Sequence, residues 1–194
     1  MPRPRRSGRG AVGAVTTRDA GPQVLTAGRV TLRELAPTQL AQVADGQSGG
    51  LVWIDGAPPE GTSTGARMMV KAVLLGTHRP GWGSYAITRT EDGVALGGIG
   101  FHAAPDADGA VEIGYDLSVS ARGGGWATDA VRLLCGWAAG QPGVRLLRAK
   151  TEPGNAASQR VLARAGFRQI GVECGADEEW FLYELPGATV RSSG

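Results

Sequence analysis

The chain has 194 residues, of which 42% are hydrophobic and 20% charged, as is ordinary for one globular domain with a substantial core. A formal charge of +2 is too small to indicate a nucleic-acid-binding surface, and no apolar run reaches the length of a membrane span. We therefore expect a cytoplasmic protein with neither a nucleic-acid partner nor a membrane contact.

The N-terminal segment differs from the rest of the chain. Residues 1–22 are rich in Arg, Gly and Pro without apolar periodicity, which is typical of a disordered tail; a transit peptide is the alternative. We expect one domain over residues 23–186 and a flexible C-terminus over residues 187–194. Cys135 and Cys174 have no metal-ligand spacing, so we expect reduced thiols and no metal site.

The first part of the domain alternates short elements with a long loop. Apolar and polar residues alternate over residues 24–35 as on a half-buried strand, and a short helix follows over residues 37–46. The loop over residues 47–65 is either a binding loop or a segment that Trp53 fastens to the core. A second helix is predicted over residues 64–75.

Three antiparallel strands are predicted next, over residues 84–89, 94–101 and 111–119. The third strand leads into the turn Gly123-Gly124-Gly125, from which a helix with one apolar face continues to residue 140. Such a turn directs unpaired N–H groups and the positive end of the helix dipole at an anion, and Arg122 could add a charge-assisted contact. Because the chain has 32 glycines, a plain turn is the alternative.

The last part of the chain is predicted to complete a mixed α/β sheet. A strand over residues 144–152 should run parallel to the strand before it, because a helix connects the two. Asn155 is a natural N-cap for a helix over residues 156–165 that ends at Gly166. Two further strands follow, which gives a sheet of about seven strands.

Two stretches resemble the acyl-CoA-binding and following motifs of the GNAT N-acyltransferase superfamily, in the branch similar to ribosomal-protein N-terminal acetyltransferases. They are Arg122-Gly123-Gly124-Gly125-Trp126-Ala127-Thr128-Asp129-Ala130 and Asn155-Ala156-Ala157-Ser158-Gln159-Arg160-Val161-Leu162-Ala163-Arg164-Ala165-Gly166-Phe167. The resemblance extends over residues 24–185. It implies a bacterial α+β protein with a mostly antiparallel sheet, helices on both faces and a splayed parallel strand pair, present as a monomer or homodimer.

The resemblance also implies that acetyl-CoA, or another acyl-CoA, binds in the splay as a co-substrate. Its pyrophosphate would lie on the N–H groups of the glycine turn, and its pantetheine arm would lie between the splayed strands. The residues implied in cofactor binding are Leu117, Val119, Arg122, Gly123, Gly124, Gly125, Trp126, Ala127, Thr128, Asn155 and Ser158.

Acyl transfer to an amine needs a proton acceptor for the amine and a proton donor for the leaving thiolate. Glu112 is the expected catalytic base, directly or through water; a solvated strand residue is the alternative. Many relatives carry a tyrosine after the equivalent of Asn155 as the acid, but this chain has none before Phe167. Ser158 is therefore the available catalytic hydroxyl, unless a water serves or Ser158 only bonds its own backbone.

His102 is a second base candidate and, with Trp53 and Asp55, an expected substrate-binding residue. Trp53, Asp55 and Glu60 of the long loop are expected to form an acceptor site for a cationic amine. The predicted function is an N-acetyltransferase that transfers acetyl from acetyl-CoA to a protein N-terminus or small-molecule amine within a ternary complex. The alternative is a non-catalytic acyl-CoA-binding or regulatory module of the same fold. A nucleic-acid-binding protein that uses the arginine-rich tail is a third reading.

Overall fold

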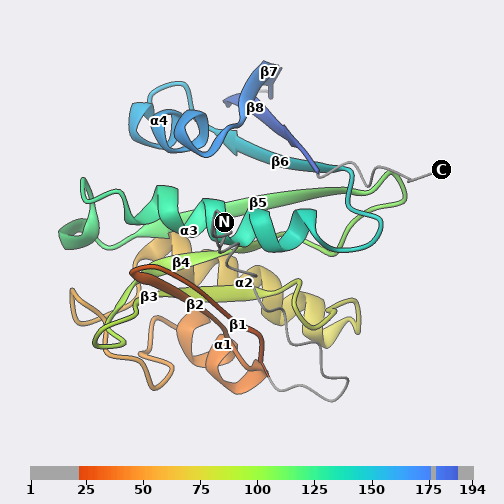
Figure 1. The fold of residues 1–194 in the computed structure, drawn as a ribbon. Helices are drawn as coiled ribbons and strands as arrows, with labels where there is room; N and C mark the ends of the chain where they lie inside the picture. The colour runs from red at the N-terminus through yellow and green to blue at the C-terminus, as the bar shows by residue number, and fades with distance from the viewer. Residues whose placement is uncertain (1–21, 176–177, 188–194) are drawn as a thin grey trace, which may run out of the picture.

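A computed structural model describes residues 22–175 and 178–187, so the predicted tail and C-terminal segment lie almost wholly outside the described residues. One eight-stranded sheet has the order β1-β2-β3-β4-β5-β6-β8-β7 (Figure 1). The elements are β1 (Val24–Ala27), β2 (Val30–Glu34), α1 (Pro37–Ala44), α2 (Glu60–Leu74), β3 (Ser84–Arg89), β4 (Ala95–Phe101), β5 (Ala110–Leu117), the 3-10 turn η1 (Val119–Ala121), α3 (Trp126–Ala139), β6 (Leu146–Thr151), α4 (Ala156–Ala165), β7 (Arg168–Cys174) and β8 (Glu179–Pro186).

The sheet has one strand more than predicted, because the single strand expected over residues 24–35 is a hairpin. Gly28 adopts φ +55°, a left-handed conformation that favours glycine, and this turn separates β1 from β2. All neighbouring strands pair antiparallel except β5 and β6. The predicted mixed, mostly antiparallel α/β fold is thus confirmed, and so is the parallel pairing across the connecting helix.

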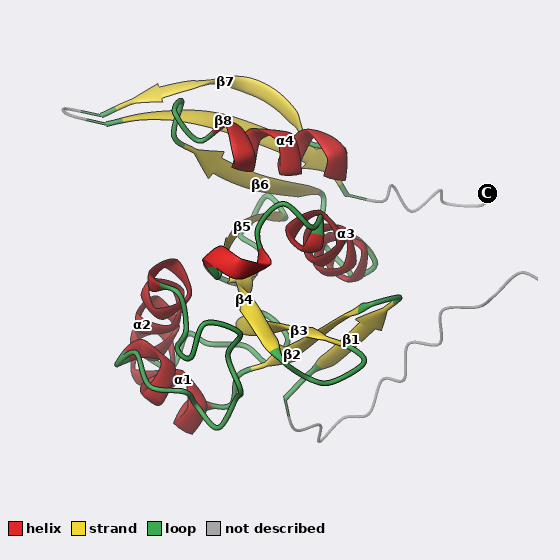
Figure 2. Ribbon diagram, turned by 90° about the vertical axis from the view of Figure 1, so that its left-hand side faces the viewer, coloured by secondary structure: helices red, strands yellow, loops and turns green. Residues whose placement is uncertain are grey.

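The helices cover both faces of the sheet, as Figure 2 shows. On one face α1 and α2 pack over a core that includes Leu40, Trp53 and Met69. On the other face α3 packs against β1, β2, β4, β5 and β6 and buries Val131 and Leu134 completely. Two apolar cores therefore hold the central strands between them.

The helix α2 begins at Glu60, four residues before the predicted start, after Pro59 at its N-cap. It lies very close to the sheet: a Cβ on Gly98 of β4 would be 2.6 Å from Cγ2 of Thr62. The N–H of Gly61 also donates a 2.9 Å hydrogen bond to Oδ2 of Asp116 on β5. Glycine at position 98 is thus required for α2 to sit directly over β4 and β5.

The parallel ladder between β5 and β6 is short. It runs from the pair Ala110 and Leu146 to the pair Ile113 and Ala149, beyond which the two strands are not paired. The strand β5 itself ends at Leu117, not at residue 119 as predicted, and the chain turns into η1. The expected splay between the parallel strands is therefore present beside Gly114.

Both cysteines are free thiols, Cys135 buried in α3 and Cys174 exposed at the end of β7. None of the helices in the described part of the chain is long and apolar enough to cross a membrane. Within residues 22–175 and 178–187, no group of three or more His, Cys, Asp and Glu side chains is placed to hold a metal ion.

Candidate active site

The glycine turn delivers the N-terminus of α3 to a groove. Gly125 occupies the N-cap position with φ +80° and ψ 0°, a left-handed conformation, and no side chain caps the first turn of the helix. The early N–H groups of α3 are therefore available to a ligand, together with the positive end of the helix dipole. This arrangement supports the anion site rather than a plain turn.

Arg29, on the turn between β1 and β2, anchors the glycine turn from outside. Its Nη2 donates a 2.7 Å hydrogen bond to the carbonyl oxygen of Gly124, and its Nε donates a 2.9 Å bond to Oδ2 of Asp129. The guanidinium also lies 4.1 Å from the centre of the Trp126 ring. Sequence reasoning missed this residue, since it lies 95 positions before the turn.

The groove beside the turn, which we call the α4 groove, has a volume of about 320 Å³ and lies between β5, the start of α3 and α4. Arg122, Arg160 and Arg164 line it and give it a positive wall. The hydroxyl of Thr128 is buried there without a hydrogen-bond partner among the described residues. Uncapped N–H groups, arginines and an unpaired hydroxyl are chemistry that suits a phosphorylated ligand such as acyl-CoA.

Eight of the residues expected to bind the cofactor line this groove: Leu117, Arg122, Gly123, Gly125, Ala127, Thr128, Asn155 and Ser158. Val119 does not, because it belongs to η1 and is 71% exposed. The carbonyl of Gly124 and the ring of Trp126 are held by Arg29 instead. The Arg122 side chain folds back, so that its Nε donates 3.1 Å to the carbonyl oxygen of Leu117.

The start of α4 positions the predicted catalytic hydroxyl. Oδ1 of Asn155 accepts a 3.0 Å hydrogen bond from the N–H of Ser158, which confirms Asn155 as the helix N-cap. The Ser158 hydroxyl lies 2.8 Å from the phenol oxygen of Tyr115 on β5. Burial raises the pKa of Tyr115 to about 12, so the phenol keeps its proton at neutral pH.

Glu112 and His102 form a pair at the splay. Nδ1 of His102 lies 3.2 Å from Oε1 of Glu112, and this hydrogen bond is the main cause that lowers the pKa of Glu112, against the opposing effect of burial. Nε2 of His102 faces the bare backbone of Gly114, where an added Cβ would be 3.0 Å away. Nε2 has no hydrogen-bond partner among the described residues, while the Glu112 carboxylate lies at Nδ1 on the other side of the ring.

The pair and the hydroxyl face one opening, which we call the splay notch, of about 420 Å³. Its walls include His102, Glu112, Tyr115, Asn155 and Ser158. Three carboxylates, those of Glu112, Glu152 and Glu173, line the notch against the single ammonium of Lys150, which pairs with Glu173 at 2.9 Å. The notch therefore has an acidic character that suits a cationic amine.

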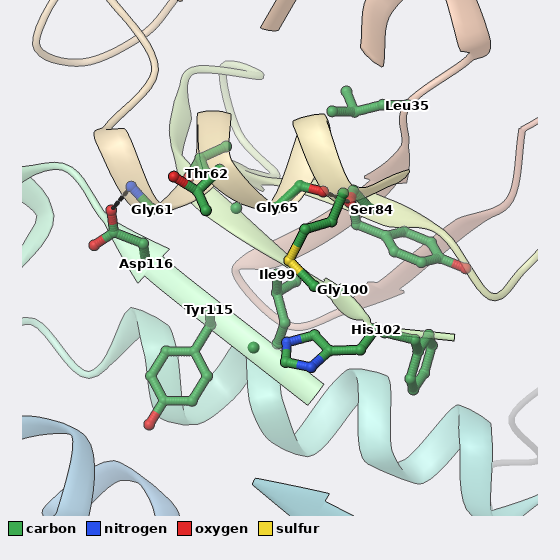
Figure 3. Close-up of a pocket in the computed structure, with 16 residues that line it drawn as sticks. Leu35, Gly61, Thr62, Gly65, Ser84, Ile99, Gly100, His102, Tyr115 and Asp116 are labelled. Carbon is green, nitrogen blue, oxygen red and sulfur yellow. Dashed lines mark hydrogen bonds between the residues drawn. The ribbon is translucent and has the colours of Figure 1, made fainter. Parts of the chain in front are cut away.

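A third opening, the α2 cavity, lies between α2 and strands β3 to β5 and has a volume of about 220 Å³ (Figure 3). His102 and Asp116 face it from the α2 side of β5, while the Tyr115 ring points to the opposite side of that strand. Its remaining lining is mostly apolar or glycine, including Met68, Ile99 and Gly100.

The residues expected to form an acceptor site in the long loop have structural partners in the fold. Trp53 is 4% exposed in the core, and its indole N–H donates to the carbonyl oxygen of Ser48, so it fastens the loop. Asp55 accepts a hydrogen bond from the N–H of Ser120, and a hydrogen bond from the Ser120 side chain is the main cause that lowers the pKa of Asp55. Glu60 lies in α2 and pairs with Arg67 on the surface. Of the expected acceptor residues, only His102 lines the openings described above.

Comparison with known families matches residues 29–168 to the acetyltransferase (GNAT) domain. The chain therefore belongs to the GNAT acetyltransferase family. An uncharacterized N-acetyltransferase of Bacillus subtilis, YjdG, is 33% identical over 87 residues, which are 45% of this chain and 52% of that protein. The chain thus spans about half the length of the curated relative it matches.

Two solved structures share the fold. A ribosomal-protein-S5-alanine acetyltransferase from Vibrio fischeri has a TM-score of 0.61 at 16% identity, over 86% of this chain and 98% of that chain. An aminoglycoside acetyltransferase in complex with coenzyme A has a TM-score of 0.57 at 19% identity, over 81% of this chain and 94% of that chain. The family and fold predicted from the two motifs are confirmed.

Proposed function

We propose that the protein transfers an acyl group, in the simplest case acetyl, from acyl-CoA to a primary amine by direct attack in a ternary complex. One observation carries this proposal: a proton-accepting pair, Glu112 and His102, and a proton-donating hydroxyl, Ser158, line the same notch. That notch adjoins the groove of the glycine turn, with which it shares Tyr115, Asn155 and Ser158.

Acyl-CoA would lie along the α4 groove. The N–H groups at the start of α3 and the guanidinium groups of Arg122, Arg160 and Arg164 would bind its phosphates. The pantetheine arm would pass into the splay, where β5 beyond Ile113 has no ladder to β6. The thioester would then reach the region of Ser158.

The amine would arrive through the splay notch. The carboxylates of the notch favour a cationic ammonium. This ammonium must lose a proton before its nitrogen can attack the thioester. Nε2 of His102 is the free nitrogen of the pair, and the carboxylate of Glu112 holds Nδ1–H and stabilises the imidazolium that forms. General-base help of this kind is worth roughly 10²–10⁴-fold.

The departing thiolate needs a proton, and Ser158 is the donor. Its position is fixed because its own N–H is bound to Asn155 at the first turn of α4. Holding amine and thioester together would contribute as much as either proton transfer or more, so loss of one acid–base group should slow the enzyme without abolishing turnover.

The acceptor class follows from the family comparison and the acidic notch. The two neighbours named above act on an aminoglycoside and on a ribosomal-protein alanine, both of which offer a primary amine. We would therefore supply acetyl-CoA with a panel of N-terminal peptides, aminoglycosides and polyamines, and follow the release of free CoA thiol together with the mass of the acetylated amine.

Acetyl-CoA-dependent mass gain on at least one amine is the expected result. Tight binding of acetyl-CoA by calorimetry with no amine modified would instead indicate a non-catalytic acyl-CoA-binding module. Failure to bind acetyl-CoA at all would contradict both, because the α4 groove would then not be a cofactor site.

A further inference from the structure

Tyr115 is where the three openings meet. It lines the α2 cavity, the α4 groove and the splay notch, and no other residue in the described part of the chain lines all three. Side chains along β5 alternate between the two faces of the strand, so Asp116 and the Tyr115 ring point to opposite sides (Figure 3). The Tyr115 hydroxyl contacts Ser158 of α4. The phenol therefore reaches the region where the thioester would lie.

Among the described residues, the phenol oxygen has two hydrogen-bond contacts, and both are with Ser158. It lies 2.8 Å from the Ser158 hydroxyl oxygen and 3.2 Å from the Ser158 carbonyl oxygen. Tyr115 has a single hydroxyl hydrogen and can donate it strongly to only one of these oxygens at a time. Which oxygen receives that hydrogen decides where the Ser158 hydrogen points.

If the phenol donates to the carbonyl, the Ser158 hydroxyl must donate to the phenol and turns away from the groove. If the phenol donates to the hydroxyl, the Ser158 hydrogen is free for another acceptor. The 3.2 Å contact to the carbonyl is longer than a normal O–H···O hydrogen bond of about 2.5–3.0 Å, whereas the 2.8 Å contact to the hydroxyl lies within that range. A phenol is also a stronger acid than an aliphatic alcohol and so the better donor of the two hydroxyls, and the second arrangement is therefore favoured. Accepting a hydrogen bond also strengthens the serine as a donor.

We infer that Tyr115 is a positioning residue, which donates its proton to Ser158 and so aims the Ser158 hydrogen at the departing sulfur. This inference rests on the proposed acyl transfer. The ammonium first gives one proton to solvent and becomes a neutral amine. As the N–C bond forms and the C–S bond breaks, the nitrogen gives its second proton to His102 and the sulfur takes one from Ser158. The proton of Tyr115 follows onto Ser158, which leaves a phenolate instead of a less stable alkoxide. The phenolate regains a proton from solvent when the products leave.

The test is Tyr115→Phe, which keeps the ring in place and removes only the hydroxyl. We expect kcat to fall by about tenfold or more, with the acetyl-CoA dissociation constant within about twofold of wild type. In a Ser158→Ala background, Tyr115→Phe should cause no further loss of kcat, because Tyr115 acts through the Ser158 hydroxyl. The double variant should therefore be no slower than Ser158→Ala alone. Replacing Tyr115 by a ring-fluorinated tyrosine, a more acidic phenol, should preserve turnover.

Tyr183→Phe is the matched control, since Tyr183 is buried, lines none of the three openings and has no side-chain hydrogen bond among the described contacts. Wild-type kcat in Tyr115→Phe, or additive losses in the double variant, would overturn the inference while the proposed function stands. A wild-type protein that acetylates no amine would overturn both. If Tyr115→Phe fails to fold, the fluorinated protein decides: a loss of turnover there contradicts proton donation.

Discussion

Gly114 leaves one nitrogen of His102 open. An alanine Cβ at this position would come within 3.0 Å of Nε2, and the glycine has an ordinary strand conformation that alanine can adopt. Gly114→Ala should therefore lower kcat/KM for the amine by about tenfold while the acetyl-CoA dissociation constant stays unchanged, because the obstruction faces the amine only.

Steady-state kinetics with calorimetry on the same protein checks this expectation. Gly171→Ala on β7 is a suitable control, since no atom lies within 4 Å of a Cβ added there. A loss that appears equally in acetyl-CoA affinity would mean that Gly114 serves the cofactor and not the amine.

The catalytic contributions of Glu112 and Ser158 should differ in their dependence on pH. The hydrogen bond from His102 holds the pKa of Glu112 below its usual value, so the carboxylate stays ionised at neutral pH and loses its charge only in acid. Glu112→Gln should reduce kcat by roughly 10²-fold near neutral pH, and the loss should shrink as rising pH deprotonates the free amine. Ser158→Ala should show no such recovery, because alkaline solvent does not protonate sulfur.

The lowered pKa of Glu112 also makes the stability of the fold depend on pH. A carboxyl whose pKa is lowered by folding contributes stability above its unfolded pKa, and this contribution is lost as pH falls through the folded value. For catalysis, parallel pH–rate profiles of Glu112→Gln and Ser158→Ala with losses under about threefold would mean that neither residue assists a proton transfer and that positioning dominates.

At the scale of elements, the hairpin β1–β2 contacts the glycine turn through Arg29. The Arg29–Asp129 pair is largely exposed, so the ion pair itself is worth only about 0.2–1 kcal/mol. Arg29→Ala should therefore change the melting temperature little. It should nevertheless weaken acetyl-CoA binding by about threefold to tenfold, because the carbonyl of Gly124 loses its anchor and the turn must be ordered on binding.

Arg89→Ala serves as the control for Arg29, because Arg89 forms an exposed pair with Asp92 in the turn after β3 and lines none of the three openings. Calorimetric titration of both variants with acetyl-CoA distinguishes them. Equal affinities for the two variants would show that the glycine turn is rigid without Arg29.

The sequence predicted the elements whose signals are local. The helix α4 between Asn155 and Gly166, the glycine turn and the alternation along β5 each depend on neighbouring residues, so propensity and capping located them. The candidate pair Glu112 and His102 was recognised as two separate bases, because the antiparallel register of β4 and β5 that joins them is a tertiary feature.

What the sequence did not reveal depends on contacts between distant residues. Tyr115 meets Ser158 across 43 positions, and Arg29 meets Gly124 across 95. Two residues of the acceptor site predicted in the long loop have structural partners that the sequence pattern does not reveal: Trp53 with Ser48, and Asp55 with Ser120. Residue types alone do not distinguish a binding loop from a loop that is fastened down.

At the scale of the whole molecule, the sheet consists of two plates that share a narrow seam. One plate contains β1 to β5 with α1, α2 and α3, and the other contains β6, β7, β8 and α4 (Figure 1). Four residue pairs between β5 and β6 form the strand pairing across this seam, with contacts between α3 and α4 beside it.

A molecule bound in the gap would act as a bridge between the plates. Without it, local opening can expose the backbone of residues 114–119 and the first turn of α4 at a lower cost than global unfolding. Acetyl-CoA should therefore slow amide hydrogen exchange at both places together, while exchange in the hairpin β1–β2 changes less. Protection confined to residues 123–128 would mean that the ligand binds only one plate, and that the two halves of the sheet open independently of the cofactor.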